Sequence, residues 1–486
     1  MRMRLDQLAR DLASSELVGD PGTEIASLAF DNRKASPGAL FFCVRGLASD
    51  GHDFAADAVE RGAAALVCER RLDLDVPQVV VADSRAAMAP VASTFNGDPT
   101  AGMKLAGITG TNGKTTTAFL LRDILEHAGT PTGLMGTVKQ VIGGAEEEVV
   151  RTTPEAIDLQ ESFRRMLEAG DEACVMEVSS HALVMHRADA IDFDLAIFTN
   201  LTQDHLDFHK DMEDYFQAKR LLFASGPDVS VVNVDDEYGR RLAVEFDCLT
   251  YSAEGRAADY SALDVSFDAA GAVFAVQSEH GEMAVRTGLP GSFNVANALA
   301  ALAGAIALGV DPEEAVAGLS EAGRVPGRFE PIDEGQQFAV LVDYAHTPDS
   351  GENVLRAARD LTGGRVIAIV GAGGDRDRAK RPLMGQAGAS LSDLVVITSD
   401  NPRSEDPSAI IEDVLSGIED RDSVVVEEDR DAAIGLAIRE AGPGDTVVIA
   451  GKGHEQGQEF ENGLKIPFDD RDVARKYLRA LTGKPA

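Results

Sequence analysis

The chain has 486 residues and a formal net charge of -36, from 45 Lys and Arg against 81 Asp and Glu. That length is too great for one hydrophobic core and suggests about three domains at roughly 150 residues each. The acidic balance argues against a nucleic-acid or anionic-membrane partner. Any anionic ligand must therefore be held locally, by backbone N–H groups, by a few placed Arg and Lys, or by bound cations.

The positions of the cysteines and the lengths of the apolar segments indicate the cellular compartment. Cys43, Cys68, Cys174 and Cys248 are far apart and lie in or beside apolar runs, which is typical of buried structural thiols. No apolar core of signal-peptide length follows the N-terminal arginines. No segment approaches the about 18 apolar residues of a membrane span. We therefore expect a soluble, reduced, cytoplasmic protein without stable membrane insertion, and a monomer.

Residues 1–100 have the texture of short strands and helices, and they end in the turn-rich linker NGDPTAG. From Met103 the pattern becomes βα. The apolar run 103–109 predicts a strand, and 114–129 predicts a helix with apolar residues at helical spacing and Gly129 as its stop. The later runs ACVMEV, LAIFTN and VSVVNV predict parallel strands buried on both faces.

A second boundary is predicted near the Gly- and Pro-rich segment 323–335, after which the same pattern restarts. Four apolar runs are each followed by a polar loop: FAVLVDYAHTPDS, RVIAIVGAGGDRDR, LVVITSDNPRSED and TVVIAGKGHEQ. In open α/β sheets ligands bind at the carboxyl ends of strands, so these loops are the expected place for a site. The sequence predicts an α/β fold with domains at 1–100, 101–328 and 329–486.

The strongest motif is GTNGKTTT, residues 110–117, between a predicted strand and a predicted helix. Such a loop directs backbone N–H groups and a helix N-terminus at phosphates, with Lys114 supplying charge and Thr115 a hydroxyl for Mg²⁺. It is a shorter variant of the general phosphate loop, because Ile108 stands where the first glycine would be. The alternative is a chance glycine-rich turn, which the strand and helix context disfavours.

Three further side chains have simple alternatives when taken alone. Glu177 follows an apolar strand and suits Mg²⁺ as a hard oxygen ligand. His205 alone is more often a hydrogen-bonded structural histidine, and Lys219 alone is more often a solvated helix lysine. Asn294 alone would be a helix N-cap, and Asp343 an ordinary carboxylate at a strand end.

Together these motifs resemble the Mur ligases and their relatives, the folylpolyglutamate synthases. The resemblance runs in order from about Phe30 to Glu455 and implies a three-domain α/β architecture: a UDP-binding α/β domain, a central P-loop ATPase-like domain and a Rossmann-like C-terminal domain. It implies catalytic roles for Lys114, Glu177, His205 and Lys219, the last as a carbamate. It implies metal ligation by Thr115, Glu177, His205 and Lys219, with ATP and Mg²⁺ as cofactors. The implied ATP contacts are Gly110, Thr111, Asn112, Gly113, Lys114, Thr115, Thr116, Asn294, Arg328, Asp343 and His346.

The outer segments indicate which substrates such a ligase would use. FDNRKASPGALFFCVRG resembles the UDP-binding pattern of the third- and fourth-acting Mur ligases, with Asn32 where serine is commoner. RTTPEAIDL resembles the segment that holds the peptide substrate, with Arg151 where Asn is frequent and Met185 in place of a polar residue. The implied contacts to UDP-N-acetylmuramoyl-L-alanyl-D-glutamate are Phe30, Asn32, Thr152, Thr153, Ser179, Arg187 and Lys219.

Specificity for the incoming amino acid rests on Asp400-Asn401-Pro402-Arg403, which resembles the signature for meso-diaminopimelate. A guanidinium suits the distal carboxylate of that amino acid, and lysine has no such group. The alternative is a plain Asn-Pro turn. Arg376, Gly451 and Glu455 match the remaining implied contacts. The resemblance thus implies ATP-dependent addition of meso-diaminopimelate to the UDP-linked dipeptide through an acyl phosphate, in peptidoglycan synthesis.

Other interpretations share only part of this pattern. A lysine-adding Mur ligase would lack the diaminopimelate signature, and a folylpolyglutamate synthase would also lack the UDP-binding segment. A motor-type or non-enzymatic P-loop NTPase would share only residues 110–117. A dinucleotide site at the glycines 371, 373 and 374 is rejected, because Arg376 stands where G-x-G-x-x-G requires glycine.

Overall fold

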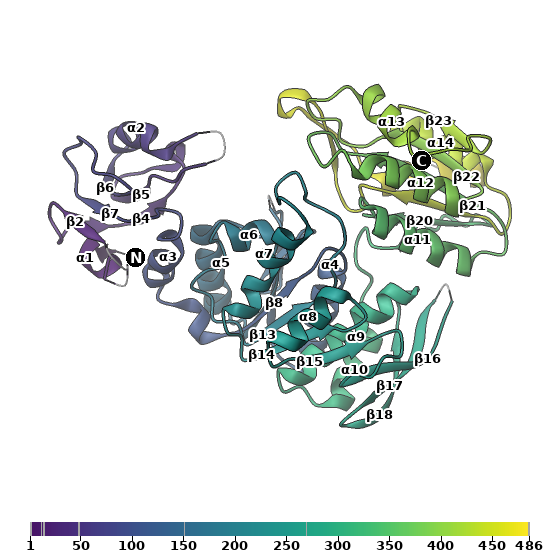
Figure 1. Ribbon diagram of the computed structural model, residues 1–486, viewed down its shortest axis with the longest axis horizontal. Coiled ribbons are helices and arrows are strands. Elements are labelled where there is room, and N and C mark those ends of the chain that lie inside the picture. The colour runs from purple at the N-terminus through teal and green to yellow at the C-terminus, as the bar shows by residue number, and fades with distance from the viewer. Residues whose placement is uncertain are drawn as a thin grey trace. The chain divides into compact units, whose positions relative to one another are not determined.

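The computed structural model describes residues 2–10, 12, 15–46, 49–149, 151–268 and 270–484 (Figure 1). The chain forms two compact units. The first contains residues 1–109, 130–196 and 218–228, and the second contains 110–129, 197–217 and 229–486. The three-domain division stays a prediction.

The first hundred residues build a five-stranded sheet in the order β2-β7-β6-β5-β4. Alternate residues of β5 and the residue after it face opposite cores: Leu40 and Phe42 pack with α1 and α3, whereas Phe41 and Cys43 pack with α2. This period of two is the expected behaviour of a strand covered on both faces. The elements are β1 (Met3–Arg4), α1 (Leu5–Leu8), β2 (Glu16–Val18), β3 (Glu24–Ile25), β4 (Ser27–Ala29), β5 (Ala39–Phe42), α2 (Ala55–Glu60), β6 (Ala63–Cys68), β7 (Gln78–Val80) and α3 (Met88–Asn96).

The rest of the first unit contains the strand order β11-β10-β9-β12-β8, in which β9, β12 and β8 run parallel. The strands predicted at 103–109 and 173–178 are confirmed as β8 (Lys104–Thr109) and β12 (Ala173–Glu177), both with buried interiors. The other elements are β9 (Thr132–Met135), β10 (Gln140–Ile142), β11 (Ala145–Glu147), α5 (Ala156–Ala169) and α6 (Ser180–Val184).

The second unit begins with the predicted helix, α4 (Lys114–His127), and α4 packs against α9 (Ser292–Ala307) and α10 (Pro312–Glu321). Its strands β14, β15 and β16 are parallel, and β16, β17 and β18 form an antiparallel meander. Two elements have residues in both units, β13 (Leu195–Phe198) and α7 (Met212–Ala224). The others up to β18 are β14 (Val229–Asn233), α8 (Glu237–Glu245), β15 (Leu249–Ser252), β16 (Tyr260–Asp268), β17 (Gly271–Ser278) and β18 (Gly281–Thr287). The strands predicted from LAIFTN and VSVVNV are thereby confirmed as β13 and β14.

The C-terminal part of the second unit is a six-stranded sheet in the order β19-β20-β24-β21-β22-β23. All neighbours except β19 and β20 are parallel. The elements are β19 (Glu330–Pro331), β20 (Ala339–Asp343), α11 (Pro348–Leu361), β21 (Val366–Ala372), α12 (Lys380–Leu391), β22 (Leu394–Ser399), α13 (Pro407–Leu415), β23 (Val424–Val426), α14 (Arg430–Glu440), β24 (Thr446–Ala450), β25 (Gly457–Glu459), β26 (Lys465–Pro467) and α15 (Asp470–Thr482).

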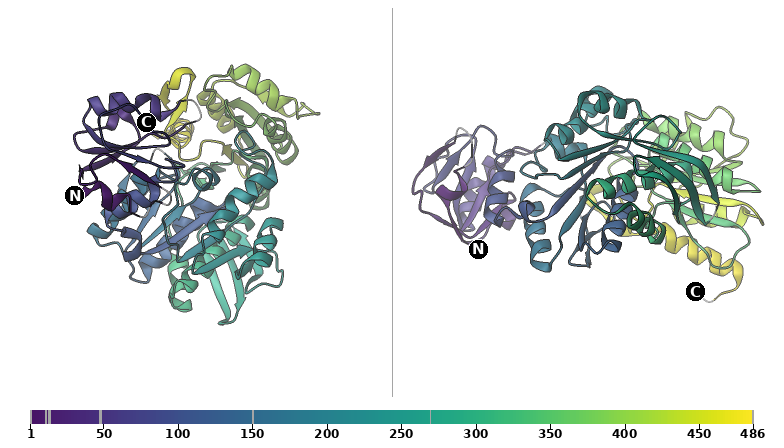
Figure 2. Two further views of the ribbon diagram at one scale, coloured as in Figure 1. Left: turned by 60° about the vertical axis from the view of Figure 1, so that its left-hand side comes forward. Right: turned by 90° about the horizontal axis from the view of Figure 1, so that it is seen from below.

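Helices cover both faces of this sheet. One core joins it to α11, α12 and α13, and the other joins it to α14 and α15. Figures 1 and 2 show the ribbon of this sheet and its helices. The four predicted apolar runs are the four adjacent strands β20, β24, β21 and β22. Because they are parallel, their polar loops emerge at one edge, as the sequence predicted. The α/β fold class is confirmed.

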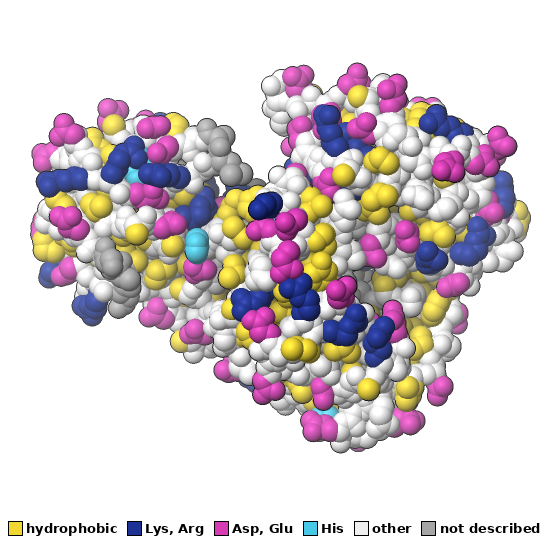
Figure 3. Space-filling model, viewed as in Figure 1, with side chains coloured by type: hydrophobic (Ala, Val, Ile, Leu, Met, Phe, Trp, Pro, Cys, Tyr) yellow, Lys and Arg dark blue, Asp and Glu magenta, His cyan; other side chains and the backbone are white. Residues whose placement is uncertain are grey.

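Surface and thiol properties follow the composition. On the face in Figure 3, acidic side chains are spread over the N-terminal, central and C-terminal parts of the chain. Cys43, Cys68 and Cys174 are buried free thiols, and Cys248 is partly buried. Burial raises the pKa of Cys43 to about 12, which keeps this thiol protonated and unreactive. Within the described residues, no helix is long and apolar enough to cross a membrane.

A fully buried ion pair joins the two helices on one face of the C-terminal sheet. Arg430 on α14 donates from Nε and Nη2 to the two carboxylate oxygens of Asp470 on α15, at 2.8 and 2.7 Å. Both side chains have 0% exposure. Arg430 also donates to the backbone oxygen of Ala450 at the end of β24, at 2.9 Å. The pair therefore attaches both helices to the edge of the sheet that carries the predicted ligand loops.

Replacing Asp470 by Asn should destabilise the C-terminal part by about 3–5 kcal/mol, because it leaves a buried guanidinium without its counter-charge. Urea unfolding followed by far-UV circular dichroism measures the loss, since the chain has no tryptophan. Hydrogen exchange in α14 and α15 locates it. The control is Asp472→Asn, whose exposed ion pair with Arg475 should matter little. Equal effects of the two variants would contradict the prediction.

Candidate active site

The glycine-rich segment 110–116 is a tight loop that leads into α4. Gly113 is the N-cap, and no described side chain makes a capping hydrogen bond there, so the N-terminus of α4 suits an anion. The Nζ of Lys114 donates to the backbone oxygens of Gly110 and Thr111, at 2.9 and 2.8 Å. Thr115 and Thr116 are buried in the first turn. The loop thus has the form of a phosphate-binding site.

Gly113 cannot be another residue without disturbing α9. Its φ is +87°, and an added Cβ would lie 2.3 Å from Oδ1 of Asn297. The Nδ2 of Asn297 donates to Oδ1 of Asn294 at 3.2 Å, and Asn294 donates to the backbone oxygen of Pro290 at 2.8 Å. The N-cap alternative for Asn294 is wrong, because Gly291 is the N-cap and Asn294 lies inside the helix. A buried amide pair therefore connects the loop to Asn294.

Arg328 connects the same loop to the C-terminal sheet. Its Nη2 donates to Oγ1 of Thr115 at 3.0 Å, and its guanidinium lies 4.5 Å from the ring centre of Tyr344. Asp343, at the end of β20, accepts a hydrogen bond from the backbone N–H of Phe329 at 2.7 Å. Burial raises the pKa of Asp343 to about 6. Asp343 is therefore a buried anchor for the segment that carries Arg328.

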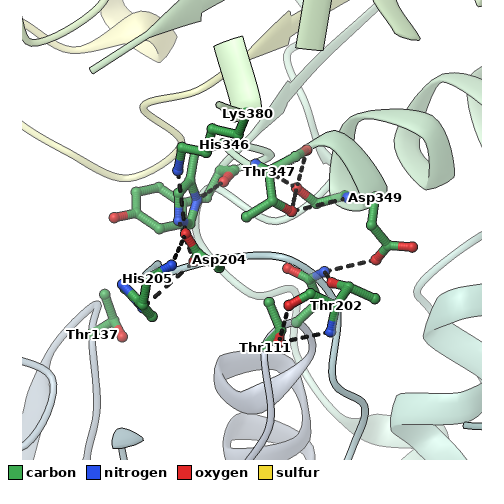
Figure 4. Close-up of polar contacts among 12 residues, drawn as sticks. Thr111, Thr137, Thr202, Asp204, His205, His346, Thr347, Asp349 and Lys380 are labelled. Atoms are coloured by element: carbon green, nitrogen blue, oxygen red, sulfur yellow. Dashed lines mark hydrogen bonds and ion pairs between the residues drawn. The ribbon is translucent and has the colours of Figure 1, made fainter. Parts of the chain in front are cut away.

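A buried carboxylate, Asp204, joins His205 to two side chains from the C-terminal part (Figure 4). It lies 3.3 Å from Nζ of Lys380, 3.7 Å from Nε2 of His346 and 3.5 Å from Nε2 of His205. Burial acts to raise its pKa, but the hydrogen bond to His346 and the charges of His205 and Lys380 hold that pKa well below its usual range. Asp204 is thus an anionic centre next to predicted ATP and metal contacts.

A second polar contact in Figure 4 starts from the glycine loop. Nδ2 of Asn112 donates to Oδ2 of Asp349, in the first turn of α11, at 2.8 Å. Burial raises the pKa of Asp349. Nε2 of Gln203 donates to Asp377 at 3.2 Å. The loop and the segment before His205 therefore both contact loops of the C-terminal sheet.

In the first unit, Glu177 is a buried carboxylate at the end of β12. Its two oxygens accept hydrogen bonds from the backbone N–H and the hydroxyl group of Thr137, at 2.8 and 3.0 Å. The hydroxyl group of Thr137 lies 3.1 Å from that of Thr152. Thr153 donates from Oγ1 to the backbone oxygen of Glu177 at 2.9 Å and accepts from the N–H of Ser179 at 3.1 Å. The predicted dipeptide contacts Thr152, Thr153 and Ser179 are thus assembled around Glu177.

Arg187 belongs to a cluster of three arginines around Glu155. Glu155 lies 3.0 Å from Arg187, 2.6 Å from Arg151 and 3.0 Å from Arg85. Burial lowers the pKa of Arg187, and its Nη1 donates to the backbone oxygen of Thr153 at 3.2 Å. Glu155 is paired with three cations, and with Asp158 close enough to interact with Glu155 and Arg151, the arginines still outnumber the carboxylates beside the predicted dipeptide contacts. In this strongly acidic chain, such an excess suits an anionic substrate.

The predicted UDP contacts Phe30 and Asn32 follow β4 at its carboxyl end. Asn32 opens a short 3₁₀ helix capped by Asp31, and its Nδ2 donates to Oδ2 of Asp57 at 2.7 Å. The sulfur of Met185 accepts a hydrogen bond from Nη2 of Arg187 at 3.4 Å. The side chains that depart from the commoner family pattern are therefore integrated into local contacts.

Lys219 lies in a different setting from the one that its residue type suggests, whereas His205 contacts Asp204, as a structural histidine can. Lys219 is 1% exposed, so the solvated-helix alternative is wrong. His205 has φ +56°, an unusual backbone conformation for a non-glycine residue, and its side chain is 36% exposed. Among the described residues, no group of three or more His, Cys, Asp or Glu forms a metal-binding cluster. The predicted donor set instead combines one hydroxyl, one carboxylate, one imidazole and a modified lysine.

The Asp400–Arg403 segment follows β22 and meets two other loops at the sheet edge. Arg403 donates from Nε to Oε2 of Glu459 at 2.9 Å and from Nη1 to the backbone oxygen of Gly374 at 2.7 Å. Gly451, at φ +121°, allows the next loop to approach, because an added Cβ would lie 2.6 Å from Oδ2 of Asp400. Arg376 is exposed and donates to the backbone oxygen of Asp375.

Asn401 connects this segment to Glu455 on the Gly451 loop, at 2.9 Å. Pro402 lies between Asn401 and Arg403 in the same segment. The structure therefore brings together most of the residues predicted to contact the amino acid. Sequence reasoning missed Asp204, Lys380, Asn297 and Lys452. Lys452 lies within the quoted run TVVIAGKGHEQ and Asp204 directly precedes the predicted His205, but nothing local in the sequence indicates their burial.

Comparison with known proteins covers almost the whole chain. Three family models match: "Mur ligase family, catalytic domain" at residues 24–95, "Mur ligase middle domain" at 108–305 and "Mur ligase, glutamate ligase domain" at 327–453. A UDP-N-acetylmuramoyl-L-alanyl-D-glutamate--2,6-diaminopimelate ligase of Geobacillus thermodenitrificans is 48% identical, covering 95% of this chain and 96% of its own. The ligase of that name from Streptomyces coelicolor is also 48% identical, covering 96% and 94%.

Solved structures give the same result. A structure titled as a UDP-N-acetylmuramoyl-L-alanyl-D-glutamate--2,6-diaminopimelate ligase is 32% identical, with a TM-score of 0.70 over 99% of this chain and 100% of that chain. A MurF structure from Acinetobacter baumannii, 21% identical with a TM-score of 0.68, shares the fold over 100% of this chain and 99% of that chain. With matches to all three family models and close relatives of nearly equal length, this chain belongs to the Mur ligase family.

Proposed function

We propose that the chain is an ATP-dependent ligase that adds meso-2,6-diaminopimelate to the D-glutamate carboxylate of UDP-N-acetylmuramoyl-L-alanyl-D-glutamate, in peptidoglycan synthesis, with ADP and phosphate as products. The observation that carries the proposal is the Asp400–Arg403 segment at the sheet edge. Its residues before Arg403 are buried, and Asn401 is hydrogen-bonded to Glu455. The names of relatives 48% identical over nearly the whole chain support it. We assign UDP binding to 1–100, ATP binding to 101–328 and amino-acid binding to 329–486.

The chemical problem is the poor leaving oxygen of a carboxylate. Transfer of the γ-phosphoryl group of ATP to the D-glutamate carboxylate forms an acyl phosphate and releases ADP. The amine of diaminopimelate then attacks the acyl carbon, loses a proton, and the C–O bond to phosphate breaks to leave an amide. Positioning and charge stabilisation are the main contributions of a protein to such phosphoryl transfer.

The residues of the chain would share this work. Lys114, held in the glycine loop, would bind the β- and γ-phosphates once they replace its two carbonyl contacts. Arg328, already hydrogen-bonded to Thr115, would add a second cation beside them. Asn294 would contact adenine, and Asp343 and His346 would border the nucleotide site. Arg187 and the Thr152–Thr153 pair would hold the dipeptide.

The donor set fits Mg²⁺. The Thr115 hydroxyl and the Glu177 carboxylate are hard oxygen donors, and His205 would complete the set with a carbamate on Lys219. Bound Mg²⁺ supplies neutralisation of phosphate and carboxylate charge. A carbamate on Lys219, which is 1% exposed, would place an oxygen anion at this buried position, and bound Mg²⁺ would neutralise it. The enzyme is proposed to act in the cytoplasm as a monomer.

The test of the function is phosphate release from ATP in the presence and absence of each co-substrate. We expect release only when both the UDP-linked dipeptide and meso-diaminopimelate are present. Release with folate and glutamate, or without any acceptor, would favour a folylpolyglutamate synthase or a simple NTPase instead.

Lys114→Ala should lower ATP turnover by about 10²–10³-fold, because it removes a cation that faces the transferred phosphoryl group. The measurement is steady-state phosphate release with both co-substrates. Lys104→Ala is the matched control, because Lys104 is exposed at the start of β8, away from the loop. Near-normal turnover in folded Lys114→Ala would refute the assignment of the loop.

Lys219→Ala should lower ligation by about 10²-fold or more, as expected for the loss of a charge stabiliser. A short carboxylic acid such as propionate should restore part of the activity by occupying the place of the carbamate. Lys210→Ala, at an exposed lysine before the same helix, should behave as wild type. Full activity of Lys219→Ala without added acid would exclude a catalytic carbamate.

Arg403→Ala should weaken productive binding of diaminopimelate by about 2–5 kcal/mol, seen as a rise in its KM of tens to thousands of fold. Activity with L-lysine should stay low, because the change builds no site for a lysine ammonium. Arg378→Ala, at an exposed arginine paired with Glu405, is the control. Wild-type use of L-lysine in competition assays would show that the specificity assignment is wrong, although the ligase assignment could stand.

A further inference from the structure

Lys452 is a fully buried lysine in the loop after β24, between two predicted amino-acid contacts, Gly451 and Glu455. Its side chain has 0% exposure. The Nζ donates to Oε2 of Glu455 and to Oδ1 of Asn401, at 2.8 Å each. A lysine is rarely buried so completely, because its charge must be paired and its three N–H groups must be satisfied. The observed partners are two of the side chains predicted to receive diaminopimelate.

Asn401 is fixed by the same contacts. Its Oδ1 also accepts a hydrogen bond from the backbone N–H of Glu459 at 3.0 Å, and its Nδ2 donates to Oε2 of Glu455 at 2.9 Å. Because the oxygen faces two donors and the nitrogen faces a carboxylate, the amide orientation is unambiguous. Asn401, Glu455 and Lys452 thus form a closed triangle of hydrogen bonds.

The triangle uses only one oxygen of Glu455. Both Lys452 and Asn401 donate to Oε2, so Oε1 is the oxygen left to receive a substrate donor. The distal carbon of meso-diaminopimelate carries a carboxylate and an ammonium group. The guanidinium of Arg403 suits the carboxylate, and Oε1 of Glu455 suits the ammonium. Specificity for both groups therefore requires the Glu455 side chain to be held in one rotamer.

The charge of Lys452 also offsets the acidic groups of this loop cluster. Asp400 is buried nearby. Burial favours its neutral form, but the charges of Lys452, Arg430 and Arg403 outweigh that effect and hold its pKa below the usual value. Removing Lys452 would take away the first of these cations and leave the side chains of Asp400 and Glu455 with less compensating charge.

We propose that Lys452 is a positioning residue for the amino-acid substrate. Its buried ammonium group holds Glu455 and Asn401 so that Glu455 can bind the distal ammonium of meso-diaminopimelate. This inference rests on the proposed function. Lys452 itself does not touch the reacting atoms.

The test is the steady-state kinetics of Lys452→Met, which keeps the length of the side chain and removes its charge. The KM for meso-diaminopimelate should rise at least about tenfold, the size expected when one charged hydrogen bond is weakened. The KM values for ATP and the UDP-linked dipeptide should not change. Lys476→Met is the matched control, because Lys476 is exposed on α15 and paired only at the surface. It should leave all three KM values unchanged.

A double-mutant cycle separates positioning from general stability. Glu455→Gln should raise the KM for diaminopimelate, and Lys452→Met/Glu455→Gln should raise it little beyond the larger single effect, since Lys452 acts through Glu455. If Lys452→Met does not fold, Lys452→Gln, which retains a donor, takes its place in the cycle.

Two outcomes would overturn the inference. The first is an unchanged KM for diaminopimelate in a folded Lys452 variant, and the second is additive effects in the cycle. If the wild-type enzyme uses diaminopimelate, either result refutes the role of Lys452 and leaves the proposed function standing. Wild-type enzyme without diaminopimelate-dependent turnover refutes the proposed function.

Discussion

Buried cations hold the loops at the carboxyl end of the C-terminal sheet, and the candidate amino-acid site depends on them. Arg381, Arg430 and Lys452 are among the largest fully buried side chains. Arg381 binds Glu405 and Asp413, Arg430 binds Asp470, and Lys452 binds Glu455. A polar loop has few apolar groups to fix it, so charged hydrogen bonds of this kind supply both direction and rigidity. Each of these buried cations needs its carboxylate partner, because the loss of one partner leaves a buried charge without compensation.

The sequence predicted the elements whose residues interact locally. The run 103–109, the glycine loop and α4 are contiguous, and their apolar spacing and glycines carry the information. The four parallel strands of the C-terminal sheet were predictable for the same reason, because strands covered on both faces are almost continuously apolar. The position of their loops was also predictable, because the carboxyl ends of parallel strands lie at one edge of the sheet.

The contacts that sequence reasoning missed are distant in the chain. Lys452 meets Asn401 51 residues away, and Asp204 meets Lys380 176 residues away. Burial of Lys219 was equally invisible from its helix, because a lysine in an amphipathic segment ordinarily points to water. The N-cap alternative for Asn294 is wrong because the helix begins two residues earlier, at Ser292, with Gly291 as its N-cap. Such features depend on tertiary packing and not on local pattern.

The acidic surface seen in Figure 3 has a consequence for the rate of substrate encounter. Nucleotides and UDP-linked peptides are anions, and a protein of net charge -36 repels them at long range. Added salt shortens the Debye length, to about 8 Å at physiological ionic strength and about 3 Å at 1 M. Screening weakens this repulsion while the arginines around Glu155 act at close range. Association should therefore accelerate as ionic strength rises, the opposite of the behaviour of a basic protein that captures the same anions.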